Sequence, residues 1–329
     1  MRYICKFIAF LSIGLAFGLS SCINETPDPE KCIFKVTLTV HSSTEWLPDY
    51  EMNSGRASEI GVEYLFRIYN AGETSSPVIE EIFYSDDLTR QDFSIDFSLR
   101  EGNYEIFVWS DFYDSSSGKS LYYNTENFSA ISYLLPYQAD SDNKDAFRGM
   151  TSLIIDDSMY GQSINAQVVL ERPLAKYMLV ATDLSDFLQT SSDDSDLRAL
   201  ESQGNFFENY SATISYPLFM PAVFNNFTNR PIDSWNDMSY QAQISPIGNG
   251  QALVGFDYVF INGEESSVQV ALQISDAEGK GVSDSGGTIN IPIKRNRTTI
   301  VYGKFLTTSS NGEITLDPTF KGQHNIEYN

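Results

Sequence analysis

Apolar and polar residues alternate along most of the chain from residue 32 onwards. In the segment 32–41, Phe34, Val36, Leu38 and Val40 alternate with polar residues, the pattern of a strand with one buried and one solvent-facing side. The period of two, or a short apolar run, recurs in the segments 60–68, 93–99, 104–108, 166–170, 238–244, 252–260, 267–275, 288–293 and 298–307. Clusters of Gly, Asn, Asp and Ser separate these segments. The pattern predicts an all-β fold of antiparallel β-sandwiches.

The chain divides most naturally at Arg172-Pro173, between two groups of predicted strands. After this point, residues 175–182 read as a buried strand, and residues 183–204 are the best helix candidate, although a Ser/Asp-rich middle weakens them as a helix. We therefore predict an N-terminal β-sandwich over residues 32–172. A C-terminal β-sandwich with one short helix is predicted over residues 173–329.

The first residues have the features of an export signal. Arg2 and Lys6 precede the apolar run 7–19, which ends in the sequence Leu19-Ser20-Ser21-Cys22. Small residues before such a cysteine resemble the bacterial lipobox, which predicts a lipoprotein signal peptide over residues 1–21 and fatty acids, palmitate among them, on Cys22. An ordinary secretory signal with an incidental cysteine is the alternative. Residues 22–31 contain two prolines and read as a short tether.

Charge and cysteine content limit the partners and the sources of stability. The 329 residues carry 44 acidic and 21 basic side chains, a net charge of −23. Such a chain repels phosphate backbones, so we predict no nucleic-acid partner. After processing at Cys22, Cys32 is the one thiol left. No intrachain disulfide can then form, and stability has to come from a buried core.

Candidate chemistry is sparse. The chain has two histidines, no Cys/His zinc spacing and no HExxH or Walker-type motif, so we predict no enzyme activity, no metal and no cofactor. The string Ser283-Asp284-Ser285-Gly286-Gly287 resembles a chymotrypsin-like nucleophile segment, with His41 upstream, but it lacks the first glycine. Residues 140–145 hold three aspartates without the glycine and glutamate of an EF-hand loop. We interpret them as a solvated acidic loop.

Aromatic residues gather in the segment 104–114, followed by Tyr122 and Tyr123. Trp109 and Tyr113 are the residues that a sugar-stacking platform would use. Packing within a sandwich core is the favoured interpretation. The platform keeps open a second function, that of a surface glycan-binding lipoprotein of a polysaccharide-utilisation system.

Several stretches resemble the Bacteroidales fimbrillin-like lipoproteins, a family that includes anchor and accessory subunits of type V pili. The stretches are the lipobox at Cys22, Tyr104–Phe112, Tyr122-Tyr123-Asn124, Asp145–Gly149, Leu170–Leu184 and Ile291–Thr307. The resemblance implies two transthyretin-like β-sandwiches in tandem and subunits joined by strand exchange, in which one subunit accepts an extended strand from another. These motifs are structural in the family, so they imply a fold and not a site.

The resemblance also directs attention to Arg56. Polymerising members of the family are cut after an arginine in the loop that follows the first strand, and Arg56 lies between the predicted strands 32–41 and 60–69. An ordinary loop residue is the favoured interpretation of Arg56. The expected function is that of a fimbrial anchor or accessory subunit, or an adhesin, facing outward from the outer membrane. Its expected partners are fimbrial subunits, the membrane through Cys22, and surface ligands or glycans.

Overall fold

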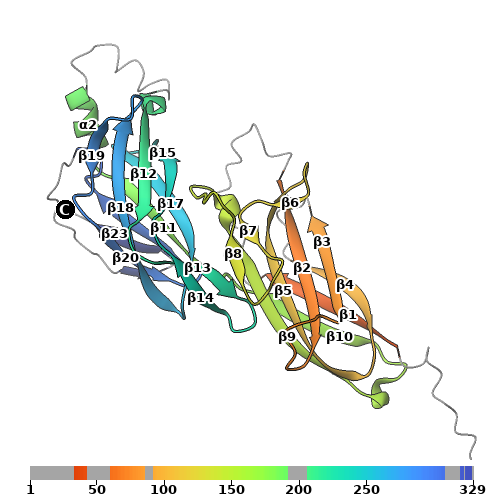
Figure 1. The fold of residues 1–329 in the computed structure, drawn as a ribbon. Helices are drawn as coiled ribbons and strands as arrows, with labels where there is room; N and C mark the ends of the chain where they lie inside the picture. Colours follow the sequence, from red (N-terminus) through yellow and green to blue (C-terminus); the bar gives the residue numbers. More distant parts are fainter. Residues whose placement is uncertain are drawn as a thin grey trace, which may run out of the picture.

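The computed structural model describes residues 33–42, 60–85, 92–191, 206–307, 319–321 and 323–327. Strands dominate these residues and form two lobes (Figure 1). The first lobe, red to yellow-green in Figure 1, holds β1 to β10, and the second, green to blue, holds the strands from β11 onwards. The predicted all-β fold is therefore confirmed.

Two sheets of the first lobe face each other across a shared apolar core. In the smaller sheet the order is β10-β1-β4, and in the larger it is β3-β2-β5-β6, with β9 also paired to β5. Val36 and Leu38 from the smaller sheet and Phe66 and Ile106 from the larger are all 0% exposed and belong to one cluster. The strands are β1 (Phe34–Ser42), β2 (Ile60–Asn70), β3 (Ile79–Ser85), β4 (Asp92–Leu99), β5 (Gly102–Asp114), β6 (Lys119–Ser120), β9 (Phe147–Ile155) and β10 (Ile164–Leu170).

The second lobe is also built from two facing sheets. One has the order β16-β17-β11-β21-β23-β22, and the other has the order β15-β12-β18-β19, with β20 paired to β18. The strands are β11 (Leu174–Ala181), β12 (Tyr210–Tyr216), β15 (Met238–Gln243), β16 (Ser245–Gly248), β17 (Gln251–Phe260), β18 (Glu265–Asp276), β19 (Gly281–Asp284), β20 (Ile289–Lys294), β21 (Thr298–Gly303), β22 (Thr319–Lys321) and β23 (Gln323–Glu327). Their inward residues form one large apolar cluster.

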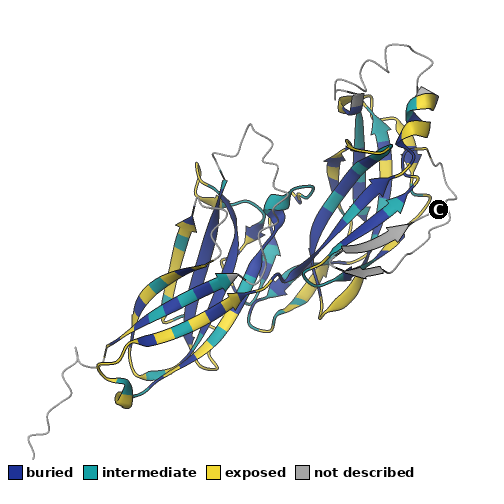
Figure 2. Cartoon of the chain, turned by 180° about the vertical axis from the view of Figure 1, so that it is seen from behind, coloured by how far each residue is buried: buried dark blue, intermediate teal, exposed yellow. Residues whose placement is uncertain are grey.

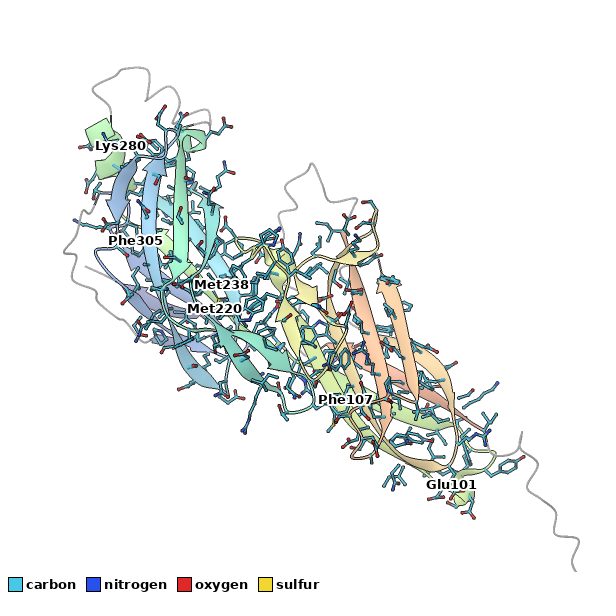
Figure 3. The ribbon with its side chains drawn as sticks, viewed as in Figure 1. Glu101, Phe107, Met220, Met238, Lys280 and Phe305 are labelled. Carbon is cyan, nitrogen blue, oxygen red and sulfur yellow. The ribbon has the colours of Figure 1, made fainter. Side chains whose placement is uncertain are left out.

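A small sheet joins the two halves of the chain. Its order is β14-β13-β8-β7, and β8 pairs with β13 through Ile131↔Phe224 and Ser132↔Val223. These strands are β7 (Tyr123–Asn124), β8 (Ile131–Tyr133), β13 (Met220–Asn225) and β14 (Arg230–Trp235). Met220 lies on the side of the second lobe that faces the first (Figure 3). The division at residues 172 and 173 falls between β10 and β11 and stays a prediction.

Burial follows the alternation read from the sequence in some strands and exceeds it in others. Buried and exposed residues alternate along strands of the first lobe in Figure 2, as in β1, where Lys35 is exposed and Val36 is buried. In β5, however, Ile106 and Val108 face the sandwich core, while Phe107 and Trp109 on the opposite side join the cluster of the second half. A strand covered on both faces is apolar almost throughout.

Helical structure is a minor part of the described residues. The α-helix α2 (Leu184–Ser191) starts close to where residues 183–204 predicted a helix, and the rest of that prediction lies largely outside the described residues. Short 3₁₀ helices are η3 (Asp142–Lys144), η4 (Asp157–Met159) and η5 (Phe206–Asn209). Among the described residues, no helix combines the length and the apolar character that crossing a bilayer requires.

Gly149 of β9 provides a test of how closely β9 packs on β10. A Cβ at this position would lie 2.6 Å from a Val168 methyl carbon and 2.8 Å from the Val169 carbonyl oxygen. We expect Gly149→Ala to lower the free energy of unfolding by about 1–3 kcal/mol, because backbone cannot move aside as a side chain does. The measurement is urea unfolding followed by tyrosine and tryptophan fluorescence.

Gly281 of β19 is the matched control for this variant. A Cβ there would meet the Gln273 amide nitrogen at 3.3 Å, the end of a flexible side chain. We expect Gly281→Ala to change the free energy of unfolding by less than about 0.5 kcal/mol. Equal effects of the two substitutions would contradict the close packing of β9 on β10.

Candidate functional site

The first strand, β1, is the central strand of its sheet although it comes from the start of the described chain. It pairs in parallel with β10, as in Leu38↔Ala166, and antiparallel with β4, as in Leu38↔Ile95. Among the described strands, β2 is the next one in sequence, and β1 forms no pair with it. Both of its edges are therefore hydrogen-bonded to strands that are distant along the chain.

Side chains of β1 hold it to the core on one face and to β4 on the other. Val36 and Leu38 are 0% exposed. On the outer face Thr37 donates a hydrogen bond to Asp96 at 2.6 Å, and His41 contacts Asp92. Removal of β1 would uncover the inner face of the sandwich and leave β4 and β10 with unpaired edges. We refer to this place between β4 and β10 as the β1 slot.

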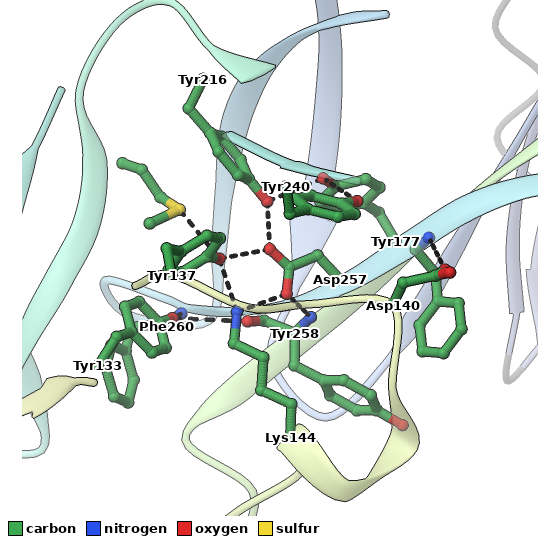
Figure 4. Close-up of polar contacts among 12 residues, drawn as sticks. Tyr133, Tyr137, Asp140, Lys144, Tyr177, Tyr216, Tyr240, Asp257, Tyr258 and Phe260 are labelled. Carbon is green, nitrogen blue, oxygen red and sulfur yellow. Dashed lines mark hydrogen bonds and ion pairs between the residues drawn. The ribbon is translucent and has the colours of Figure 1, made fainter. Parts of the chain in front are cut away.

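A second feature is a buried polar cluster between the two halves of the chain, which we call the Tyr–Asp–Lys network. Its centre is the carboxylate of Asp257 on β17, and its only cation is Lys144 at the end of η3, with side chains 0% and 1% exposed. Tyr137 and Tyr216 hydrogen-bond to Asp257, and Tyr177 extends the network from Tyr216 to Tyr240 (Figure 4). The network consists of Tyr137, Lys144, Tyr177, Tyr216, Tyr240 and Asp257.

Each oxygen of the Asp257 carboxylate accepts two hydrogen bonds. Oδ2 accepts from the hydroxyls of Tyr137 and Tyr216, both at 2.5 Å. Oδ1 accepts from Lys144 Nζ at 2.5 Å and from the backbone N–H of Tyr258 at 2.7 Å. A buried carboxylate is stable in the fold when its lone pairs are satisfied in this way.

Burial determines the protonation of the groups around Asp257. Desolvation lowers the pKa of Lys144 to about 8, although the Asp257 carboxylate acts in the opposite direction. The pKa values of Tyr137 and Tyr216 are raised well above 10, chiefly by burial and also by the charge of Asp257. These hydroxyls therefore stay protonated and keep donating to the carboxylate at neutral pH.

The acidic residues next to Lys144 are engaged in the same region. Asp145 forms an ion pair with Arg172 at 2.6 Å, and Asp142 forms one with Lys176 at 2.6 Å. Asp145 is 4% exposed. The interpretation of residues 140–145 as a solvated acidic loop was therefore wrong for Asp145, which is buried in its ion pair with Arg172, whereas the Asp142 side chain stays 34% exposed beside Lys176. The segment anchors the first half of the chain to the second.

The site residues predicted from the sequence lie outside the Tyr–Asp–Lys network. Cys22 and Arg56 lie outside the described residues, so lipidation and processing stay predictions. Trp109 is 0% and Tyr113 is 7% exposed. The Trp109 ring packs beside Tyr123 and Phe260, and its Nε1 donates to Asp111. A glycan platform on these two residues stays a prediction, and it would require their rings to become accessible.

Sequence reasoning missed the Tyr–Asp–Lys network because its two charges are 113 positions apart. One signal was present. Asp257 is the only charged residue in the otherwise apolar strand 252–260, and a charge in such a strand needs a buried partner. The sequence does not identify which of the 21 basic residues that partner is.

Asp140 gives the region a pH dependence. Its two carboxylate oxygens accept from the backbone N–H groups of Phe256 and Gln243, at 3.2 and 3.3 Å. Burial outweighs these bonds and raises its pKa from 3.8 to about 6. The folded state therefore holds this proton more tightly than the unfolded state. Its stabilising effect is present below about pH 4 and is lost as the pH rises through about 6.

We expect Asp140→Asn to become more stable relative to the wild type as the pH rises from 4 to 8. Asparagine keeps an acceptor, tolerates the positive φ of 57° at this position, and never acquires a charge. Urea unfolding at both pH values measures the difference. Asp237→Asn, at an exposed position with a φ of 55°, is the matched control. A difference for Asp140→Asn that is the same at both pH values would contradict the assignment.

The chain is similar to several solved structures at low sequence identity. It is similar to the tip fimbrial protein Mfa3 from Porphyromonas gingivalis (11% identity, 90% of this chain and 98% of that chain, TM-score 0.41). It is also similar to the fimbrial anchor protein Mfa2 from the same organism (11% identity, 76% and 82%, TM-score 0.38). A third similar structure is a fimbrial assembly protein from Parabacteroides distasonis (12% identity, 84% and 92%, TM-score 0.40).

A search of curated proteins finds no match to this chain. The match to a sequence family is extensive, because it covers residues 30–329 and so includes every described strand of both lobes. The chain belongs to the family of unknown function DUF6562.

Proposed function

We propose that this protein is a lipid-anchored subunit of a fimbrial or adhesive assembly on the cell surface, joined to other subunits by strand pairing. The observation that carries the proposal is the β1 slot. β1 fills a central position between β4 and β10 and has no pairing with the strand next to it in sequence. Such a strand is held by contacts that a strand of another subunit is able to reproduce.

The energetics of the slot favour an occupied state. Val36, Leu38 and Val40 are at most 1% exposed, and burial of each contributes roughly 1.5–3 kcal/mol. The two strand edges add backbone hydrogen bonds along the whole of β1. An empty slot would expose both, so the slot holds either β1 itself or a strand of equivalent pattern. In an anchor subunit β1 stays, and in a polymerising subunit it is replaced.

The sequence on either side of β1 supports the same function. The predicted lipid site, Cys22, and the tether 22–31 precede β1, and Arg56 lies between β1 and β2. Cleavage at Arg56 would separate β1 from the rest of the fold. Without it, β1 connects the sandwich to the membrane lipid. The net charge of −23 keeps the remaining surface away from an anionic bilayer, which leaves the lipid as the attachment.

A disulfide between β1 and β4 tests strand exchange. Thr39 and Ser94 are cross-strand partners with their hydroxyls 3.1 Å apart. A specific protease site inserted between β1 and β2 allows β1 to be released. We expect the cut protein to bind a labelled peptide of residues 34–42 in exchange for its own strand. The cut Thr39→Cys/Ser94→Cys variant, oxidised, is expected to exclude the peptide.

The control places a disulfide in the second lobe, where Thr213 and Gln241 are cross-strand partners in β12 and β15. This variant is expected to exchange as the wild type does, because its β1 stays free to leave. Size-exclusion chromatography with fluorescence detection measures the bound peptide. Failure of both the cut wild type and the control variant to take up peptide would contradict strand exchange.

Lipid anchoring has a separate test. We expect Cys22→Ala, expressed in a Bacteroidales host, to lose incorporation of labelled palmitate and to leave the membrane fraction. Cys5→Ala is the matched control, because this cysteine lies within the predicted signal peptide. Protease digestion of intact cells then reports whether the wild-type protein faces outward. Palmitate incorporation that persists in Cys22→Ala would show that the lipid site is elsewhere.

A further inference from the structure

Lys144 and Asp257 bring an amine and a carboxyl group into direct contact in the interior of the molecule. Nζ lies 2.5 Å from Oδ1, and the two side chains are 1% and 0% exposed. One residue comes from η3 and the other from β17, so they belong to different halves of the chain. We propose that these side chains condense into an amide, which crosslinks the chain covalently between Lys144 Nζ and Asp257 Cγ.

The surroundings of the pair exclude water. The rings of Tyr133 and Tyr137 lie 4.4 and 4.1 Å from Nζ, and both residues are buried. In so dry a site the separated charges of an ion pair lose most of the solvation that stabilises them in water. The exclusion of water also disfavours the reverse reaction, hydrolysis of the amide.

The amine has to be neutral to act as a nucleophile. Burial lowers the pKa of Lys144 to about 8, even with the opposing effect of the adjacent carboxylate. A proton that leaves Nζ does not have to leave the site, because the neighbouring carboxylate accepts it. The pair is then an uncharged amine beside an uncharged carboxylic acid, with no change in total charge.

Tyr137 provides a path for this proton. Its hydroxyl accepts from Lys144 Nζ at 2.6 Å and donates to Asp257 Oδ2 at 2.5 Å, so it bridges the two reacting groups (Figure 4). Tyr216 donates to the same Oδ2 at 2.5 Å, and the Tyr258 N–H donates to Oδ1 at 2.7 Å. Because this path delivers the proton to Oδ2, negative charge develops on Oδ1 when the carboxyl carbon is attacked, and the Tyr258 N–H is already placed to stabilise it there.

The condensation balances without any further reactant. The lone pair of Nζ attacks Cγ, a C–N bond forms, and the carbonyl π electrons move to Oδ1, which the Tyr258 N–H holds. The carbonyl then re-forms as the bond between Cγ and the protonated Oδ2 breaks. Nζ gives up one proton and the carboxylic acid gives up its hydroxyl, so the leaving molecule is water. The product is a secondary amide with no charge at either residue.

Amide formation requires a buried pair and an amine that can become neutral. Each of the other ion pairs of this region lacks one of these two properties. Arg172 and Asp145 are also buried, but a guanidinium stays protonated and does not act as a nucleophile. Lys176 and Asp142 are an amine and a carboxylate 2.6 Å apart, but the Asp142 side chain is 34% exposed and remains in contact with solvent. Lys176 is therefore an internal control within the same protein.

The amide would hold the two halves of the chain together. Segments 113 residues apart would become covalently joined at the base of η3 and on β17. A mechanical force applied to either lobe would then be carried by a covalent bond. Without the amide, an ion pair would carry it. The inference rests on the geometry of this pair and of the groups around it, and it is independent of the proposed function.

Peptide mapping of the full-length protein tests the proposal. The purified protein is denatured, digested with trypsin and analysed by tandem mass spectrometry. We expect a linked species that joins the peptides containing Lys144 and Asp257, lighter than their sum by one water, with no cleavage after Lys144. Cleavage after Lys176 is expected to be normal. Complete cleavage after Lys144, with both peptides at full mass, would overturn the proposal, as would a loss of water mapped within a single peptide.

Two variants test separately whether Lys144 forms the amide and whether Tyr137 assists its formation. Lys144→Arg keeps the positive charge and is expected to give no linked species. In Tyr137→Phe, whose folding is checked by near-ultraviolet circular dichroism, we expect the linked fraction to fall and to increase slowly on incubation. A folded Tyr137→Phe that is fully linked from the start would overturn the role of Tyr137 as proton path. The map of the wild type decides on the bond even if either variant fails to fold.

Discussion

The relation between the two halves of the chain depends on the burial of a single carboxylate. Asp257 lies in the interior, where an ionised group is stable only with complete hydrogen bonding, and its partners come from η3, from β12 and from the segment before η3. Each partner must therefore be in place for the others to be satisfied. This requirement selects one arrangement of the halves, which apolar packing alone leaves less defined.

The same constraint explains why several cations of this acidic chain are hidden. Lys144, Arg172 and Lys176 are 8% exposed or less, and each pairs with an aspartate of the region. Each of these cations is neutralised by its own aspartate, so the three pairs leave the net charge of −23 to the rest of the chain. Phosphate-rich or anionic partners are disfavoured on the surface of so acidic a chain. The proposed pairing of strand edges uses backbone groups, which carry no net charge, and is therefore compatible with that surface.

The extent to which the sequence predicts this fold depends on the range of the interactions. The alternation of apolar and polar residues predicted β1 and the inward face of β5, because a strand with one solvent-exposed face shows that exposure in its own sequence. It did not predict that Trp109 faces a second core, since most of that core is built by strands of the second half of the chain. The Tyr–Asp–Lys network was missed for the same reason. Asp257 marks a buried charge in the sequence, but the pairing with Lys144 exists only in three dimensions.

The β1 slot and the Tyr–Asp–Lys network lie on opposite sides of β5. Ile106 and Val108 of this strand face the core that β1 completes, and Phe107 and Trp109 face the core shared with the second half. β5 is a long strand, with 13 residues, and it pairs with β2 along 11 of them. Replacement of β1 in the slot would therefore affect one face of β5, while the other face of β5 stays packed against the second half of the chain. The proposed exchange of β1 would be compatible with a firm joint between the halves, because β5 lies between β1 and the residues that join the halves.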